Sequence, residues 1–217
     1  MRCMVSFSCL LSIVTWALVA EADTLTYRRR QGDKVLETTF RIQPTANGYE
    51  LFKENREEKT RMVLGRAGET VSWDFQAKEL PISFKAVRQG HRIKIVGTKD
   101  GQPVQESVRI DDKPWYQDVG FSAKDFITSG ESSRAFWMLH PKKLSAHQMK
   151  LTRMTTDSLA VGGRQEKVVK SKLTIDNFFL ARWWSAYHWH RLSDGLFVKY
   201  QGRGRRGEPD VIVNIVR

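Results

Sequence analysis

The feature that most restricts how this chain can fold is the alternation of apolar and polar side chains, which continues from residue 23 almost to the C-terminus. It is cleanest over residues 71–78. There the apolar side chains Val71, Trp73, Phe75 and Ala77 alternate with polar ones. Successive side chains of a β-strand point to opposite faces, so a period of two predicts strands with one buried face.

Tight turns separate the expected strands, at Asn47-Gly48, Gln89-Gly90, Asp100-Gly101 and Gly162-Gly163 among others. Short strands joined in this way build an antiparallel meander, and we find no crossover helices of the kind that a parallel sheet needs. The sequence therefore predicts an all-β fold, or at its margin a β-rich α+β fold.

One stretch, around residues 114–144, departs from this pattern and predicts a helical insertion. Ser122 and Asp125 have the spacing of a capping box, and Gly130 is a typical helix stop. A second short helix is expected over residues 133–140, ended by Pro141. The aromatic residues of the insertion are sufficient to cover one mouth of a curved sheet.

The N-terminal residues indicate the compartment. Arg2, a short apolar run over residues 10–19 and the Ala20-Glu21-Ala22 site are typical of a signal peptide spanning residues 1–22. Both cysteines, Cys3 and Cys9, lie in this leader, so residues 23–217 form no disulfide. An exported domain without cysteine favours the bacterial periplasm, and no transmembrane segment is expected after cleavage. Residues 23–217 suit a single domain.

The formal net charge of +12 falls entirely on residues 23–217, because Arg2 and Glu21 cancel in the leader. A strongly basic protein favours anionic partners. Export argues against nucleic acid and leaves an anionic envelope component, such as an acidic lipid surface. The alternative is that the charge keeps the outer strand faces solvated.

An aromatic hairpin is expected over residues 181–203, turning at Ser193-Asp194-Gly195. Trp183, Tyr187 and Trp189 fall on one face of its first strand and Trp184 on the other. A one-sided sheet needs only one apolar face, so the insertion, a partner or a ligand is expected to cover the second. Either face is compatible with the concave side.

A basic loop follows the hairpin and carries Arg203, Arg205 and Arg206. It matches G-x-G-x-x-G, but another strand follows in place of the helix that a dinucleotide site requires. Arginine suits phosphate and carboxylate, so the loop is a candidate anion-binding site, with a solvated loop as the alternative.

His188 and His190 share a strand face, which is a geometry for two metal ligands, but no third or fourth ligand is recognisable. No nucleophile elbow or carboxylate pair appears either. The sequence therefore predicts no cofactor and no enzymatic activity; a metal-dependent hydrolase using these two histidines is a remote alternative.

Several weak motifs occur together in one order. An opening strand pair with a Gly-Asp-Lys turn spans residues 27–42, an aromatic-Pro segment 136–141, a Val-Gly-Gly strand entry 161–163, and an aromatic strand with an Asp-Gly turn 187–200. Together they resemble exported bacterial families of unknown function whose architecture is similar to the lipoprotein-localisation half-barrels. The resemblance implies one strongly curved antiparallel sheet, an open half-barrel, around a short helical insertion, with an apolar concave face.

The leading functional hypothesis is a periplasmic, non-enzymatic binding or carrier-like protein that holds a lipid-like ligand, or a partner's apolar segment, on its concave aromatic face. The expected ligand-binding residues are Trp73, Phe75, Trp137, Trp183, Trp184, Tyr187 and Trp189. Arg203, Arg205 and Arg206 would lie near an anionic head group. The alternative is an envelope structural or adaptor protein that docks through a basic surface.

Overall fold

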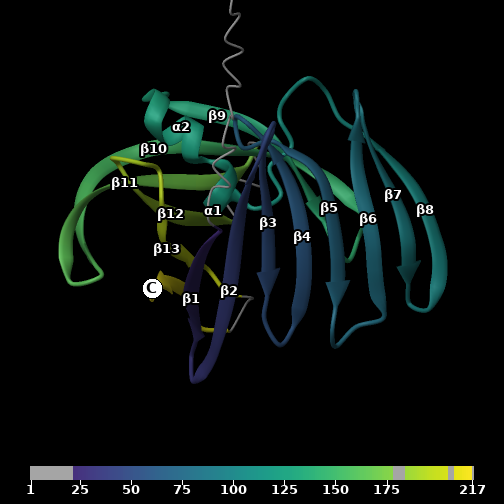
Figure 1. Cartoon of the computed structure of the whole chain (residues 1–217), viewed down its shortest axis with the longest axis horizontal. Helices are drawn as coiled ribbons and strands as arrows, with labels where there is room; N and C mark the ends of the chain where they lie inside the picture. The colour runs from purple at the N-terminus through teal and green to yellow at the C-terminus, as the bar shows by residue number, and fades with distance from the viewer. Residues whose placement is uncertain (1–21, 178–183, 205–207, 217) are drawn as a thin grey trace, which may run out of the picture.

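A computed structural model describes residues 22–177, 184–204 and 208–216. In this part of the chain, fourteen strands form one sheet and two short helices interrupt the strand order (Figure 1). The elements are β1 (Asp23–Gln31), β2 (Lys34–Thr45), β3 (Gly48–Glu54), β4 (Glu58–Gly65), β5 (Thr70–Ala77), β6 (Ile82–Gln89), β7 (Arg92–Lys99), β8 (Gln102–Arg109), α1 (Val119–Ser122), α2 (Lys124–Ser129), β9 (Ser133–His140), β10 (Ser145–Val161), β11 (Arg164–Ile175), β12 (Ser185–Arg191), β13 (Phe197–Gly202) and β14 (Val211–Ile215).

The strand order is β8-β7-β6-β5-β4-β3-β2-β1-β14-β13-β12-β11-β10-β9, and every strand pair is antiparallel. Two meanders, β1–β8 and β9–β14, are thus joined where the first strand pairs with the last; Tyr27 lies opposite Ile215. The sheet is open, with β8 and β9 as its edges. The expected antiparallel half-barrel is confirmed.

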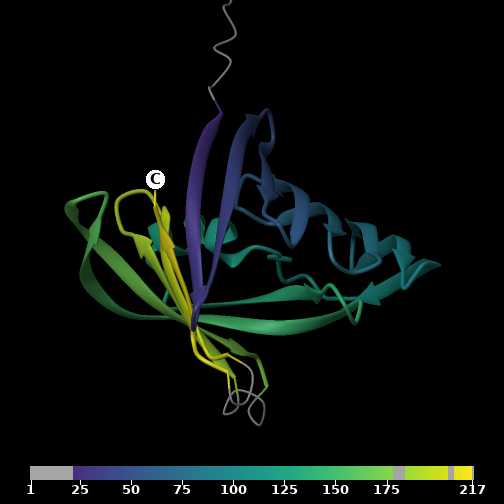
Figure 2. The ribbon, with the colours of Figure 1, turned by 90° about the horizontal axis from the view of Figure 1, so that it is seen from below.

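In Figure 2, β1 stands at the centre, the rest of the first meander turns away to one side, and the short helices lie between this meander and the second. The inner face of β1–β8 is apolar because each strand contributes alternate residues to one core, including Leu51, Trp73, Phe84 and Ile95. Residues 110–118 and β9 cover part of this face, through Trp115 and Leu139. The inner faces of the two meanders therefore share a core with the insertion.

The insertion is less helical than expected. Gly130 ends α2 in the left-handed conformation (φ 79°), as its position predicts. Ser122 does not cap α2, because Ala123 occupies the N-cap and the Ser122 hydroxyl is buried without a partner.

The prediction of a helix over residues 133–140 is wrong, because this stretch forms strand β9. One edge pairs with β10 along its whole length, and the other meets residues 114–116. The Trp137 amide donates to the Pro114 carbonyl, and the Trp137 carbonyl accepts from the Tyr116 amide, each at 2.8 Å. Tertiary pairing on both edges overrides the local helical signal.

Strand β5 departs from the expected alternation at one point. Val71 is 43 % exposed, because a bulge between β4 and β5 sets Leu64 opposite Thr70 and Val63 opposite Ser72. The extra residue takes Val71 out of the apolar row. Trp73 and Phe75 remain on the inner face.

Candidate functional site

The interior between the two meanders contains two hollows. The first, the inner cavity, has a volume of about 330 Å³ and lies between β1–β4, the residues around α1, and β11–β14. Aromatic and charged side chains line it together, among them Tyr27, Arg29, Phe40, Lys53, Glu58, Asp118, Trp184, His188, Phe197 and Tyr200.

The second hollow, the inter-sheet groove, has a volume of about 630 Å³. It runs between the inner face of β1–β4 and the turn that joins β12 to β13. Apolar side chains form most of its lining: Leu25, Ile42, Tyr49, Leu51, Leu64, Phe121, Leu196 and Phe197. Asp23, Lys124, Arg191 and Asp194 add charges to that lining. Both volumes lie within the range of small-molecule sites.

An aromatic cluster stands between the two hollows. Tyr27 stacks on Phe197 with ring centroids 5.2 Å apart, and Phe121 lies 4.7 Å from Phe40. The Tyr27 hydroxyl donates a hydrogen bond of 2.8 Å to the Phe197 carbonyl. Because Phe197 lines both hollows, this cluster is the wall that separates them.

One of the charged residues that line the inner cavity, Asp118, lies outside its two ion pairs. Arg29 pairs with Glu57 at 2.7 Å, and Lys53 pairs with Glu58. Asp118 makes no ion pair within the described ranges. Burial raises the pKa of the Asp118 carboxyl, although the nearby Lys53 charge and the amide of Phe121 oppose that rise.

Lys53 is held in its charged form. Burial alone lowers the pKa of its ammonium group, but Glu58 and Asp118 raise it further, and the net shift is upward. Its Nζ lies 5.8 Å from the centroid of the Phe40 ring. The cavity therefore already places one cation beside an aromatic face.

His188 and His190 lie on the cavity side of β12 and are buried. Burial lowers the pKa of His188 to about 3, with His190 adding to the shift, and burial lowers the pKa of His190 to about 4. His190 Nε2 is 3.1 Å from the Gly120 carbonyl, whereas Nδ1 of each ring has no partner. Both rings are neutral near pH 7. In the part of the chain that the structure describes, no group of three or more His, Cys, Asp or Glu is placed to hold a metal ion.

The residues expected to bind a ligand are dispersed by the fold. Trp184 lines the inner cavity. Trp73 and Phe75 are buried in the core against Phe84, and Trp137 donates from Nε1 to Asp111 at 2.7 Å. The structure therefore brings Trp184, but not these three, to the inner cavity.

Tyr187 and Trp189 lie on the opposite face of β12. Two lysine ammonium groups stand over their rings: Lys170 lies 4.7 Å from the Tyr187 centroid and Lys199 4.8 Å from that of Trp189. Arg203 is exposed just beyond β13. Trp183, Arg205 and Arg206 lie outside the described residues, as does the predicted leader up to residue 21.

Sequence reasoning missed Asp118 and Lys53. A signal for Lys53 was present, because it follows Tyr49 and Leu51 at a spacing of two and so falls on the apolar side of β3. A lysine on the apolar side of a strand needs an acidic partner or a solvent-filled cavity for its ammonium group. Asp118 lies in an irregular segment, where no period indicates a direction.

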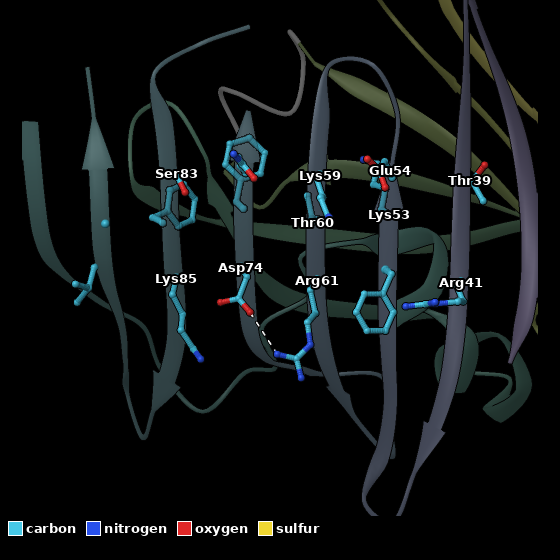
Figure 3. A pocket seen from close by; sticks show the side chains of 16 residues that line it. Thr39, Arg41, Lys53, Glu54, Lys59, Thr60, Arg61, Asp74, Ser83 and Lys85 are labelled. Carbon is cyan, nitrogen blue, oxygen red and sulfur yellow. Dashed lines mark ion pairs between the residues drawn. The ribbon is translucent and has the colours of Figure 1, made fainter. Parts of the chain in front are cut away.

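A third hollow, of about 950 Å³, lies on the outer face of β2–β7. Figure 3 shows Arg41, Arg61, Asp74 and Lys85 on neighbouring strands along this face. Arg41 stacks on Phe52 at 4.4 Å, and Arg61 pairs with Glu50 and Asp74. Much of its charge is paired internally, which fits a solvated strand face better than a ligand site.

No protein-family model and no curated protein sequence matches the chain. Within residues 22–177, 184–204 and 208–216, no helix has the length and apolar character needed to cross a membrane.

Two solved structures are similar in fold. One is the crystal structure of a β-barrel-like protein with a domain of unknown function, DUF1849, from Brucella abortus: TM-score 0.63 and 7 % identity over 89 % of this chain and 95 % of that one. The other is the hypothetical lipoprotein YmcC from Escherichia coli, with TM-score 0.36 and 10 % identity over 89 % and 86 % of the two chains. The first comparison shows the fold alone. This chain therefore shares the fold of a β-barrel-like protein with a domain of unknown function.

Proposed function

We propose that this is an exported, periplasmic, non-enzymatic binding protein that holds a lipid-like chain in the inter-sheet groove. The observation that carries the proposal is the groove itself: about 630 Å³ between the two meanders, with a lining that is mostly apolar. Burying an alkyl chain there removes its surface from water, at roughly 0.8 kcal/mol per CH2 group.

The site differs from the one expected on aromatic residues. Trp73 and Phe75 are 4 % and 8 % exposed, so packing already uses their apolar surface. The groove depends instead on aliphatic residues of β1–β4, such as Leu25 and Ile42, together with Leu196 near the β12–β13 turn. A ligand there would lie between the meanders rather than on an open aromatic face.

The first experiment is native mass spectrometry, with organic extraction, on protein purified from a bacterial periplasm. We expect a bound apolar molecule of defined mass. The mass of the protein should equal that of a chain that begins at Asp23. A protein that is clean of ligand and fails to take up fatty acids added in vitro would contradict the binding proposal. A retained leader would contradict the proposed export.

Ile42→Trp tests the place of binding, because a larger ring at this half-buried position fills the groove. We expect at least a ten-fold loss of fatty-acid affinity, measured by displacement of a fluorescent fatty acid. Val35→Trp is the matched control: it lies in the same strand, is 45 % exposed and does not line the groove. Equal affinities of the two variants would contradict the assignment of the groove.

A second candidate function is an adaptor that docks on an anionic envelope component. The observation that favours it is the lysine-rich outer face of β11–β13, where Lys170 and Lys199 stand over Trp189. Binding to anionic but not neutral vesicles, lost in Lys170→Glu/Lys199→Glu, would support this reading. It would also leave fatty-acid binding unchanged.

A further inference from the structure

One carboxylate of the inner cavity makes no ion pair within the described residues. Of the charged residues that line it, Arg29 and Lys53 each have an acidic partner, Glu57 and Glu58. Asp118 remains, half-buried beside the N-terminal end of α1, with its Oδ1 close to Gly120. With Asp118 ionised, the four charged residues of the lining, Arg29, Lys53, Glu58 and Asp118, are balanced. Glu57, outside the lining, neutralises Arg29, so the ion pairs leave the Asp118 carboxylate as the charge without a partner.

The remaining lining is uncharged and includes several aromatic side chains. Trp184 and Tyr200 come from the β12–β13 side, and Tyr27 and Phe40 from β1 and β2. His188 adds a neutral ring that is 5 % exposed, with Nδ1 unpartnered. The faces of such rings carry partial negative charge, so the walls attract a positive group.

The chemistry of the cavity discriminates between classes of ligand. Arg29 and Lys53 are already engaged by Glu57 and Glu58, so an anion would meet the unpaired Asp118 carboxylate in a partly desolvated space, where like charges repel. An uncharged apolar molecule would remove water from Asp118 without replacing its hydration. A cation neutralises the carboxylate and uses the ring faces.

We propose that the inner cavity binds a small organic cation of the ammonium class, held between the Asp118 carboxylate and the rings of Trp184 and Tyr200. The volume of about 330 Å³ suits a small molecule rather than a peptide. The position of Lys53 against Phe40 is an internal precedent for a cation beside these walls. The proposal does not rest on the groove, which lies beyond the Tyr27–Phe197 wall.

The test is isothermal titration of the protein, residues 23–217, with choline and with its uncharged isostere 3,3-dimethyl-1-butanol. The two probes have nearly the same shape, so the difference between them isolates the charge. We expect choline to bind at least ten-fold more tightly. Equal binding, tighter binding of the alcohol, or no binding of choline would overturn the proposal.

Asp118→Asn assigns the site, since it keeps the shape and removes the charge. We expect at least a ten-fold loss of choline affinity. Asp74→Asn is the matched control, because it removes the same charge from the outer face of β5. Equal losses in the two variants would overturn the assignment.

Trp184→Leu is a second probe should Asp118→Asn fail to fold. Trp184 is half-buried, and its loss should weaken choline at least five-fold. Fatty-acid binding in the groove should remain, which separates failure of this proposal from failure of the lipid proposal. An unchanged choline affinity in a folded Trp184→Leu protein would overturn it.

Discussion

At the scale of single residues, the paired histidines of β12 have their main effect on stability. Their rings lie nearly parallel, with centroids 6.2 Å apart, and both are buried against the insertion. Protonating either ring would put a charge into this space. The folded state therefore keeps both neutral, whereas the unfolded chain protonates them near pH 6.5.

The free energy of unfolding should consequently fall as the pH drops. A histidine whose pKa is depressed by folding stabilises the protein above the unfolded pKa. That stability is lost as the pH falls from 6.5 to about 4 for His190 and to about 3 for His188. Each ring contributes a slope of at most about 1.4 kcal/mol per pH unit. Urea unfolding at several pH values measures it.

His188→Phe should remove about half of this slope. Nδ1 of His188 has no hydrogen-bond partner, so a phenyl ring of similar shape should not weaken the fold at neutral pH. An unchanged slope in this variant would contradict the assignment.

At the scale of elements, β9 is the clearest case of tertiary structure overriding a local pattern. Residues 133–140 are compatible with a helix when read alone, but β10 pairs with one edge and residues 114–116 with the other. The side chain of Trp137 adds a third anchor through its bond to Asp111. The strand is therefore fixed by contacts that no short window of sequence contains.

Trp137→Phe tests this anchor. Phenylalanine keeps an aromatic ring but lacks the indole N–H and its 2.7 Å bond to the Asp111 carboxylate, so we expect a destabilisation of about 1 kcal/mol in urea unfolding. The pKa of Asp111, held at about 2 by Lys113 and then by Trp137, should rise in an NMR titration. Because Asp111 stabilises the fold above its unfolded pKa near 3.9, the variant should lose less stability on acidification. Identical Asp111 titrations in the two proteins would contradict the contact.

The alternation of apolar and polar residues predicts the parts of the sheet in which each strand pairs with the next strand in the sequence. The strand predicted over residues 71–78 and the hairpin strands predicted within 181–203 are confirmed where the structure describes them, as β5, β12 and β13, because alternation and turn residues act locally. The β1–β14 pairing and the bulge beside Val71 depend on residues far apart or on other strands. The charges of the inner cavity escaped prediction for the same reason: Lys53 and Asp118 approach each other only after the sheet has curved.

At the scale of the whole molecule, β14 is the joint between the two meanders. It pairs with β1 on one side and β13 on the other, and Val213 lies opposite both Arg29 and Tyr200. Losing these bonds would expose two long strand edges at the middle of the sheet. A substitution that disrupts the pairing of β14 should therefore destabilise both meanders.

Val213→Pro should destabilise the protein by about 3 kcal/mol more than Val213→Ala. Alanine removes side-chain packing alone, whereas proline also removes a backbone donor from the centre of the sheet. Chemical unfolding of the two variants measures the difference. Equal stabilities of the two variants would contradict the inference that the backbone hydrogen bonds of β14 hold the two meanders together.

The pairing of the first strand with the last also governs when this protein can finish folding. Most of its strand pairs join strands that are adjacent in sequence and form early, but the β1–β14 pair that unites the sheet spans nearly the entire described chain and closes slowly. A chain emerging N-terminus first lacks its central strand until residues 211–215 appear. Until then the sheet is incomplete, so the chain reaches its final fold only after its last strand is available.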